Sequence, residues 1–460
     1  GFGRDVSRFT ERKRVVKDKN LGPLVSTDMT RCIHCTRCVR FGQEIAGIPE
    51  LGTVGRGDRM QISTYIEKSV DHELSGNIID LCPVGALNNK AYRYRARAWE
   101  MTQHPLVSPH DCAGTNLYGH VLRGRLMRVV PRANEAINET WIADRDRYSC
   151  EGLYADDRAG RPMVKEGGTW REVDWETALE AAAAGLQKVV REHGAGQVGM
   201  LVSPAASLEE GYLTARVARG LGSENIDHRL RRVDFRDQAG DPLAPTLGCS
   251  IAELEQASAL LLVGSNLRQD VPIIAHRVRK GVLRRGTRVA FVNPQPIDVL
   301  FPVEAQLTSN GYGMAQHLAA ILAAAVRASG NPSPATLSPA LAGIVPTAEH
   351  ERVARMLTEG ALRVIVLGAL AERHVAYSEI RAVAAALATV TGARLGFLPE
   401  GANAVGASLA GVTPHRGVGG RAVAKPGLAA AEMIGARLRA YVLVGGIETE
   451  DLPPSFGVEN

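Results

Sequence analysis

From about residue 165 onward, short uninterrupted apolar runs alternate with longer stretches in which apolar residues recur at helical spacing. Apolar runs of this kind, separated by amphipathic segments, are typical of a parallel sheet with helices on both faces. The predicted strands are Val198–Val202, Leu260–Val263, Val289–Val292, Val364–Leu367 and Tyr441–Val444. The predicted helices are Trp175–Glu192, His317–Val326 and one that begins at the capping-box match of Ser250 with Glu253. This part of the chain is therefore predicted to be α/β.

The residues before 165 follow a different pattern, with shorter segments and more turn residues. Leu51–Lys68 predicts a β-hairpin, because apolar and polar residues alternate after a turn at Gly55–Asp58. Residues 105–150 predict another small β-rich piece, with a turn at Arg123 and Gly124. Residues 1–20 are rich in charges of both signs, which predicts a solvated connecting segment.

Cysteines provide the strongest chemical signal in the chain. Cys32, Cys35 and Cys38 place three thiols in seven residues, and Cys82, followed by proline, comes much later. A C-x2-C-x2-C loop can wrap three corners of an iron–sulfur cube while a fourth cysteine arrives from elsewhere. Thiolates suit iron–sulfur clusters or zinc, but structural zinc sites more often use two separated pairs. The pattern favours a [4Fe–4S] cluster, with a zinc site or unliganded thiols as the alternatives.

The residues around the triplet leave two interpretations open. Arg31, Arg37 and Arg40 either stabilise the negative charge of a bound cluster and raise its potential, or simply face solvent. His34 lies between two of the cysteines, but we do not expect it to be a ligand, because four thiolates complete the set.

Other candidate features receive structural interpretations. Cys112, Cys150 and Cys249 stand alone in the sequence and are expected to be small buried hydrophobes. The alternation of arginine and aromatic residues in Tyr92–Trp99 predicts a packed or interface helix rather than a nucleic-acid stacking surface. Gly264–Asn266 follows a predicted strand, yet no dinucleotide or Walker motif follows any strand, so we expect a tight turn there. No catalytic triad or carboxylate pair stands out.

Composition excludes several classes of protein. Of the 460 residues, 45% are hydrophobic and 22% charged, which fits a folded chain of several domains. A net charge of +5 is too small to indicate nucleic acid or an anionic membrane, and no apolar run approaches the ~20 residues of a membrane span. Seven cysteines, four of them in one region, do not resemble a secreted disulfide framework and indicate a reducing, cytoplasmic compartment. The first residue, Gly1, is not an initiator methionine, so we expect the chain to be part of a longer one.

Two runs, Thr30–Phe41 and Asp80–Leu87, resemble the large iron–sulfur subunit of respiratory complex I, the proton-translocating NADH:quinone oxidoreductase. Less specific stretches are similar in style, namely Asn225–Leu230, Leu261–Asn266 and Gly401–Ala407. Carried over residue by residue, the resemblance implies that one [4Fe–4S] cluster is held by Cys32, Cys35, Cys38 and Cys82.

The resemblance also implies a function, as a subunit of an enzyme rather than as a complete one. The chain would relay single electrons between iron–sulfur centres on the way from NADH and flavin to quinone, with no catalytic residue of its own. Its partners would be the peripheral-arm subunits that bind flavin and NADH or carry iron–sulfur clusters, and not nucleic acid. It would lie on the cytoplasmic side of the bacterial inner membrane, attached only through the complex. Further [2Fe–2S] and [4Fe–4S] clusters would lie in a part that precedes Gly1.

A second cluster site of some family members is expected to be lost. The positions of its C-x2-C-x3-C-x27-C pattern are Ser108, Asp111, Thr115 and Ala143, and none is cysteine. The α/β part resembles molybdopterin oxidoreductases such as formate dehydrogenase, but we expect no molybdopterin here. The alternative function is a molybdopterin-dependent catalytic subunit, for which Cys249 would be a candidate metal ligand.

Together these features predict an α/β chain of three domains. A partial [4Fe–4S]-binding α+β domain covers residues 1–100. A small β-rich domain that resembles the cluster domain of molybdopterin oxidoreductases, without its ligands, covers residues 101–158. A molybdopterin-oxidoreductase-like region with parallel sheets covered by helices covers residues 159–460.

Overall fold

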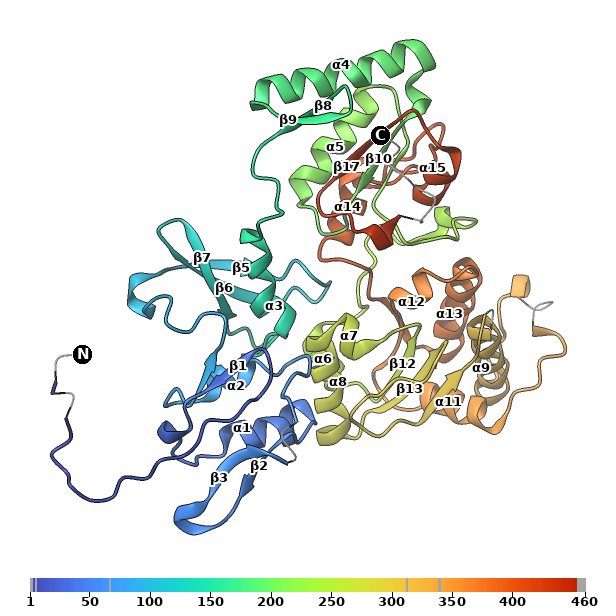
Figure 1. The fold of residues 1–460 in the computed structure, drawn as a ribbon. Coiled ribbons are helices and arrows are strands. Elements are labelled where there is room, and N and C mark those ends of the chain that lie inside the picture. The colour runs from blue at the N-terminus through green and yellow to red at the C-terminus, as the bar shows by residue number, and fades with distance from the viewer. Residues whose placement is uncertain (1–2, 5, 66–67, 312, 338–340, 453–460) are drawn as a thin grey trace. The chain divides into compact units, whose positions relative to one another are not determined.

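The computed structural model of the chain describes residues 3–4, 6–65, 68–311, 313–337 and 341–452. The chain forms two compact units (Figure 1). Unit 1 comprises Gly1–Pro105, Tyr118–Pro131 and Trp141–Cys150, and unit 2 comprises Leu106–Leu117, Arg132–Thr140 and Glu151–Asn460. The three-domain division given above remains a prediction.

Unit 1 is built from short strands and helical turns. Strand β1 (Val25–Thr27) pairs antiparallel with β4 (Leu87–Asn89). The predicted hairpin is confirmed as the antiparallel pair β2 (Leu51–Val54) and β3 (Gln61–Thr64), although part of the predicted range lies outside the described residues. The helical elements are η1 (Met29–Arg31), α1 (Arg37–Arg40), the π-helix η2 (Phe41–Ala46), α2 (Asn77–Leu81) and α3 (Asp144–Tyr148).

Two sequence predictions between residues 90 and 131 have opposite outcomes. The β-rich piece is confirmed as a sheet in the order β5 (Thr102–Val107), β6 (Asn116–Leu122) and β7 (Arg125–Pro131). The predicted turn at Arg123 and Gly124 connects β6 to β7, and both residues have positive φ. The predicted helix at Tyr92–Trp99 is wrong: its residues form turns that end in the 3-10 turn η5 (Ala98–Glu100), and Tyr94 has a left-handed φ of 66°.

A five-stranded parallel sheet forms the larger core of unit 2, and it confirms the predicted α/β class. Its order is β14 (Ala305–Thr308), β13 (Arg288–Asn293), β12 (Ala259–Val263), β15 (Arg363–Leu367) and β16 (Arg394–Phe397). Alternate residues of β12 enter two different hydrophobic clusters, which is why the whole strand is apolar. Helices α9 (Gly313–Ser329), α11 (Ala348–Thr358) and α13 (Tyr377–Thr391) cover one face, and α6 (Ile251–Leu254) and α8 (Pro272–Arg285) cover the other (Figure 1).

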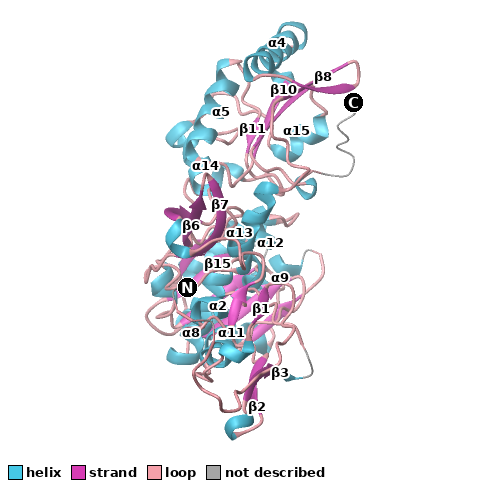
Figure 2. Cartoon of the chain, turned by 60° about the vertical axis from the view of Figure 1, so that its left-hand side comes forward, coloured by secondary structure: helices cyan, strands magenta, loops and turns pink. Residues whose placement is uncertain are grey.

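The remaining predicted strands belong to a second parallel sheet, in the order β11 (Ile226–Asp227), β10 (Val198–Val202) and β17 (Ala440–Val444). Strand β10 lies between α5 (Leu208–Gly220) and α15 (Ala430–Ala436), as Figure 2 shows. The other elements of this part are α14 (Ala404–Ala410), the hairpin β8 (Met163–Glu166) and β9 (Thr169–Glu172), and the predicted helix α4 (Trp175–His193).

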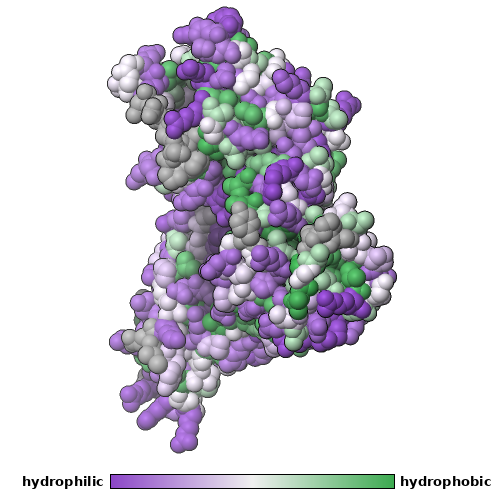
Figure 3. Space-filling model, turned by 90° about the vertical axis from the view of Figure 1, so that its right-hand side faces the viewer, coloured by the Kyte–Doolittle hydropathy of each residue, from purple (hydrophilic) through white to green (hydrophobic). Residues whose placement is uncertain are grey.

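Polar side chains predominate on the face drawn in Figure 3, and apolar residues are scattered in small patches between them. Within the described ranges, no helix combines the length and the apolar character that crossing a membrane requires.

The turn after β12 requires glycine. Gly264 has a φ of +60°, and a Cβ atom built on it would lie 2.2 Å from the backbone nitrogen of Ala371. Its own N–H donates to the carbonyl of Val292 at 2.8 Å, which holds the start of the turn against strand β13. The tight strand-to-helix turn predicted at this position is therefore confirmed, with α7 (Leu267–Asp270) following it.

We expect Gly264→Ala to lower the free energy of unfolding of unit 2 by about 3 kcal/mol or more, because left-handed strain and a backbone clash add. Thermal and urea unfolding followed by circular dichroism measure the loss. Gly286→Ala is the matched control, since Gly286 also has a positive φ (+74°) but nothing lies within 4 Å of the position its Cβ would take. The control is expected to lose only about 1 kcal/mol; equal losses would contradict the clash.

Candidate metal centre

The β1–β4 ladder brings the two cysteine-bearing segments together. Thr27 pairs with Leu87 in antiparallel register. Cys32 lies five residues beyond Thr27, and Cys82 lies five residues before Leu87, so both leave the same end of the ladder. The N–H of Asp28 donates to the carbonyl of Ala86 at 2.8 Å, which extends the connection toward the cysteines.

All four predicted ligands line one pocket. Cys32, Cys35 and Cys38 come from the loop between η1 and α1 and from the start of α1, and Cys82 comes directly after α2. Each is partly buried. The other lining residues are mostly apolar, including Met29, Ile33, Ile62, Val84, Ala86 and Leu87. The structure thus brings together every residue that the spacing predicted.

Two residues with left-handed backbone give the loop its curvature. His34 and Thr36 have φ values of 55° and 58°. Such conformations cost free energy in residues other than glycine and persist only where the surroundings impose them. Here they alternate with the cysteines and turn the chain around the pocket, so that three thiols within seven residues can share it.

The pocket makes the Cys38 thiol reluctant to ionise. Burial raises the pKa of Cys38 to about 11, and the neighbouring sulfurs of Cys32, Cys82 and Cys35 add to the rise. The backbone N–H of Ala86 donates to Cys82 Sγ at 3.2 Å, a contact that stabilises a thiolate. Four thiolates could therefore coexist here only with a bound cation or cluster, whose binding would release their protons.

The four thiols form a ligand set that suits two kinds of metal group. Thiolates hold either a structural zinc ion or an iron–sulfur cluster. Among the described residues, no three His, Cys, Asp or Glu side chains converge in the geometry of a single-ion site.

The three arginines near the triplet differ in their contacts. Arg31 Nη1 lies 3.2 Å from Asp28 Oδ2 and 3.4 Å from the Gly85 carbonyl, which links its side chain to the turn after Cys82. Arg37 lines the pocket but is exposed, and Arg40 is exposed. Arg40 thus faces solvent, as one interpretation has it, while stabilisation of a bound cluster by Arg31 or Arg37 stays a prediction.

Sequence reasoning missed the role of the N-terminal segment. Most of residues 6–20 are exposed, as predicted, but Val16 is only 6% exposed, and Asp18 Oδ1 accepts from the Met29 N–H at 2.7 Å. Thr27 and Thr30 hydroxyls bind the backbone of this segment as well. The apolar Val16 within a charged run was the available signal.

Arg14 connects this segment to the cysteine loop. Its Nη1 lies 2.8 Å from His34 Nε2, and its Nη2 donates to the Met60 carbonyl. Because Nε2 of His34 is occupied by this guanidinium, it accepts from Arg14 rather than facing the pocket as a ligand. Arg14 therefore stabilises the cysteine loop through contacts with His34 and Met60.

The other cysteines lie elsewhere. Cys150 is buried, as predicted, and its Sγ is 3.7 Å from the Arg147 carbonyl. Cys112 and Cys249 are half-buried beside one hydrophobic core of unit 2. Burial raises the pKa of Cys249 to about 11, and Glu253 adds to the rise. None of the three lines the four-cysteine pocket.

The loop that carries the first three positions of the second cluster pattern is closed by hydrogen bonds. The Ser108 N–H donates to the Thr115 carbonyl at 2.9 Å, and Asp111 Oδ1 accepts from the Ala113 N–H at 2.9 Å. All three of Ser108, Asp111 and Thr115 are buried. Oxygen-bearing side chains thus occupy positions where thiolates would be needed for iron.

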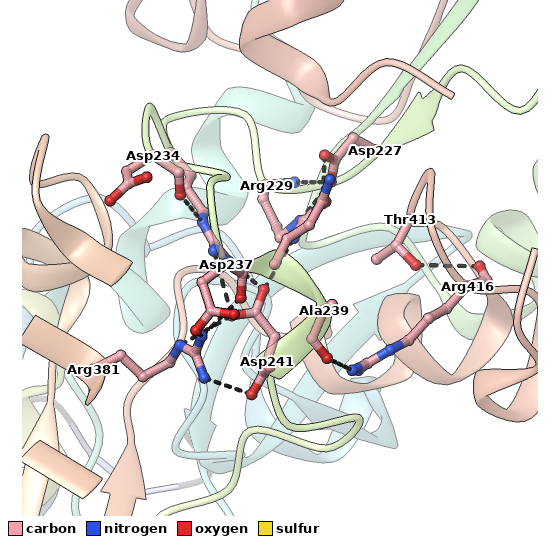
Figure 4. Close-up of polar contacts among 12 residues, drawn as sticks. Asp227, Arg229, Asp234, Asp237, Ala239, Asp241, Arg381, Thr413 and Arg416 are labelled. Atoms are coloured by element: carbon pink, nitrogen blue, oxygen red, sulfur yellow. Dashed lines mark hydrogen bonds and ion pairs between the residues drawn. The ribbon is translucent and has the colours of Figure 1, made fainter. Parts of the chain in front are cut away.

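Unit 2 contains a cavity of about 70 Å³ at the carboxyl ends of its parallel strands. Arg229, on the loop after β11, contacts Asp227 Oδ1 at 2.8 Å and Asp241 Oδ2 at 3.1 Å (Figure 4). Asp241 also binds Arg232 Nη1 at 2.5 Å. Burial alone would raise the pKa of Asp227, but the charge of Arg229 lowers it below its usual value. The carboxylates of the chain thus neutralise these two arginines.

Three other polar groups that line the cavity are also paired within the chain or carry no charge. Arg231 contacts Glu400 Oε1 at 3.0 Å and Glu448 Oε2 at 2.7 Å. His228 Nδ1 donates to the Val412 carbonyl at 2.8 Å. Burial lowers the pKa of His415 to about 4, assisted by Arg229 and Arg416 nearby, so this imidazole is neutral at physiological pH.

Three family models match the chain. Residues 22–88 match the ferredoxin-like domain of NADH-quinone oxidoreductase subunit 3, a range that contains all four pocket cysteines. Residues 107–151 match the NDSU1/NuoG-like 4Fe-4S domain of NADH-ubiquinone oxidoreductase. Residues 158–445, more than half of the chain, match the molybdopterin oxidoreductase model.

Curated relatives give the same picture. The NADH-ubiquinone oxidoreductase 75 kDa subunit of Reclinomonas americana is 41% identical over 313 residues, which cover 64% of this chain and 43% of the relative. An NADH-quinone oxidoreductase subunit of Rickettsia felis is 40% identical over 290 residues, 62% of this chain and 42% of the relative. The chain therefore spans less than half of the length of these relatives. The resemblance to the large iron–sulfur subunit of complex I is confirmed.

Among solved structures, the acetylene hydratase of Pelobacter acetylenicus matches with a TM-score of 0.49 and 15% identity, over 62% of this chain and 43% of the other. A likeness at this level supports no conclusion about function.

We expect Arg14→Ala to accelerate the loss of iron from the reconstituted chain to a chelator by about 10-fold, the scale at which outer-shell partners affect metal sites. The change removes the brace on His34 but no ligand. Release of iron, followed by absorbance, measures the effect. Arg12→Ala, at an exposed arginine of the same segment, is the control; equal rates in both variants would contradict a bracing role.

Proposed function

The chain belongs to the molybdopterin oxidoreductase family, and we propose that it is an electron-relay subunit of NADH:quinone oxidoreductase rather than a molybdopterin-dependent catalyst. One observation carries the proposal: four cysteines from two distant motifs line a single pocket, within the range that matches an NADH-quinone oxidoreductase ferredoxin-like domain. The relatives that support it are named as subunits of that enzyme.

In the proposed mechanism, Cys32, Cys35, Cys38 and Cys82 hold one [4Fe–4S] cluster. A cluster bound there supplies a site that accepts and releases one electron at a time. The chain's own residues keep that site rigid and largely dry. Met29, Ile62 and Leu87 exclude water from the thiols, and the Ala86 N–H favours negative charge on Cys82. No side chain is assigned as an acid, base or nucleophile.

The wider setting of the relay is also part of the proposal. Electrons would travel from NADH and flavin through neighbouring iron–sulfur centres toward quinone, in a complex that translocates protons. The partners would be its flavin- and NADH-binding and iron–sulfur subunits, with no nucleic acid involved. The chain would lie on the cytoplasmic side of the bacterial inner membrane and reach it only through the complex. Further [2Fe–2S] and [4Fe–4S] centres would belong to the protein outside these residues.

The cavity of unit 2 does not fit a molybdopterin cofactor. Its volume of about 70 Å³ is below the ~300–1,000 Å³ typical of ligand pockets. A phosphate-bearing cofactor also needs available cations, whereas Arg229, Arg231 and Arg232 are paired with carboxylates of the chain. Cys249, half-buried with a raised pKa, offers no ready thiolate. These contacts support the relay over the catalytic alternative.

The test is anaerobic reconstitution of the chain with ferrous iron and sulfide. We expect about four iron and four sulfide per chain and an S = 1/2 electron paramagnetic resonance signal after dithionite reduction. Cys82→Ala is expected to abolish that signal, because one corner of the cube loses its ligand. Cys112→Ala, at a half-buried cysteine of unit 2, is the matched control and is expected to keep it.

Two results would contradict the proposal. Stoichiometric zinc without sulfide in the purified chain would leave a structural metal site in place of a relay. Molybdenum bound in stoichiometric amount would restore the catalytic alternative.

A further inference from the structure

Exposed aromatic residues and arginines gather in the segment 92–99, which follows strand β4. Tyr94 is 86% exposed and Trp99 81% exposed. The segment between them is nevertheless anchored, because the Tyr92 hydroxyl donates to the Ala96 carbonyl at 2.8 Å and Arg128 stacks on the Tyr92 ring at 4.6 Å. Tyr92 thus faces inward while Tyr94 and Trp99 remain available to solvent.

Cations accompany both exposed rings. The Arg93 guanidinium lies 4.6 Å from the Tyr94 ring centre, and that of Arg97 lies 5.8 Å from the Trp99 ring centre. Arg97 is exposed, and no carboxylate in the described part of the chain forms an ion pair with its side chain. Arg95, between them, is exposed too. The charge of Arg97, at least, is not neutralised by an ion pair among the described residues.

Asp28 links these residues to the cysteine loop. Its Oδ1 lies 2.7 Å from Arg93 Nη2, and its Oδ2 lies 3.2 Å from Arg31 Nη1. Arg31 directly precedes Cys32, and Ile33, which follows it, is 61% exposed. A continuous set of contacts therefore runs from Tyr94 to the loop that bears three of the thiols.

We propose that this surface docks the acidic face of a neighbouring redox protein subunit. We name it the arginine–aromatic surface, comprising Arg31, Ile33, Tyr94, Arg95, Arg97 and Trp99. Tryptophan, tyrosine and arginine are the residue types that dominate binding free energy at protein interfaces, and the positive charge of the arginines complements carboxylates. The proposal rests on the proposed function, because a partner seated here would lie beside the thiols that hold the relay.

A protein partner is favoured over nucleic acid. The whole chain carries a net charge of only +5, and this surface contributes only three arginines, Arg31, Arg95 and Arg97. Proteins that track a nucleic-acid backbone need an extended basic groove. A small cationic and aromatic patch beside a redox pocket instead fits one acidic protein face.

The experiment measures the affinity of the reconstituted chain for the remaining peripheral subunits of NADH:quinone oxidoreductase from the same organism, purified without it. We expect the double variant Arg95→Glu with Arg97→Glu to raise Kd by at least about 10-fold, and high salt to weaken binding of the unaltered chain. Trp99→Ala is expected to raise Kd by a similar factor without changing charge.

The control is the double variant Arg56→Glu with Arg59→Glu, which changes charge equally on the exposed β2–β3 turn. It should bind like the unaltered chain. Iron content and the reduced signal separate the two proposals: if the unaltered chain holds no cluster, the proposed function fails. If every variant keeps its cluster and both charge-reversed pairs bind alike, only the docking proposal is overturned. Patch-dependent self-association, or saturable binding of a single-stranded RNA in place of the subunits, would also overturn it.

Discussion

Antiparallel pairing of β1 with β4 is the interaction on which the candidate centre depends. A cluster site built on C-x2-C-x2-C needs its fourth thiolate from another segment, and here two short strands provide the closure. Asp28, one residue past β1, secures it with its backbone and carboxylate, because it contacts Ala86, Arg31 and Arg93. Helix α2 then aims Cys82 from the far side, and Arg147 holds Asp80 of that helix. Several charged contacts outside the pocket thus position the two segments that carry its four cysteines.

Much of the fold and of the candidate site could be predicted from the sequence, because both depend on local patterns of apolar residues and cysteines. The strands of unit 2 lie in parallel sheets buried on both faces, so each appears as a continuous apolar run. Strands β11, β14 and β16 were missed, since they are short and occupy sheet edges, where Asp227 or Arg394 is tolerated. Cysteine spacing predicted four ligands, and the four cysteines do line one pocket. The bracing by Arg14 escaped prediction, since it depends on a contact between residues twenty apart without a periodic signal.

Charged side chains occur both in buried ion pairs and at the surface. In unit 2, buried ions are paired within the chain: Glu139 contacts His276 at 3.0 Å and Arg277 at 3.2 Å, as Asp227 contacts Arg229 in the cavity. Removing one partner of such a pair leaves a buried charge uncompensated, so these networks fix packing rather than bind ligands. In unit 1, cations such as Arg97 stay at the surface next to aromatic rings. Unit 1 also buries the paired Arg147 beside Asp80, so internal ion pairs stabilise the packing of both units.

Burial also explains why four of the seven cysteines are candidate metal ligands and the other three are not. A thiol is reactive or metal-binding as a thiolate, and apolar burial opposes ionisation. Cys150 is buried alone and Cys249 has its pKa raised to about 11, so each remains a small hydrophobe. Cys38 has an equally raised pKa, yet it is not alone: three more sulfurs share its pocket. Burial thus opposes ionisation of the Cys38 thiol, so a metal group that this thiol helps to hold would have to offset that cost, as the cationic core of an iron–sulfur cluster would.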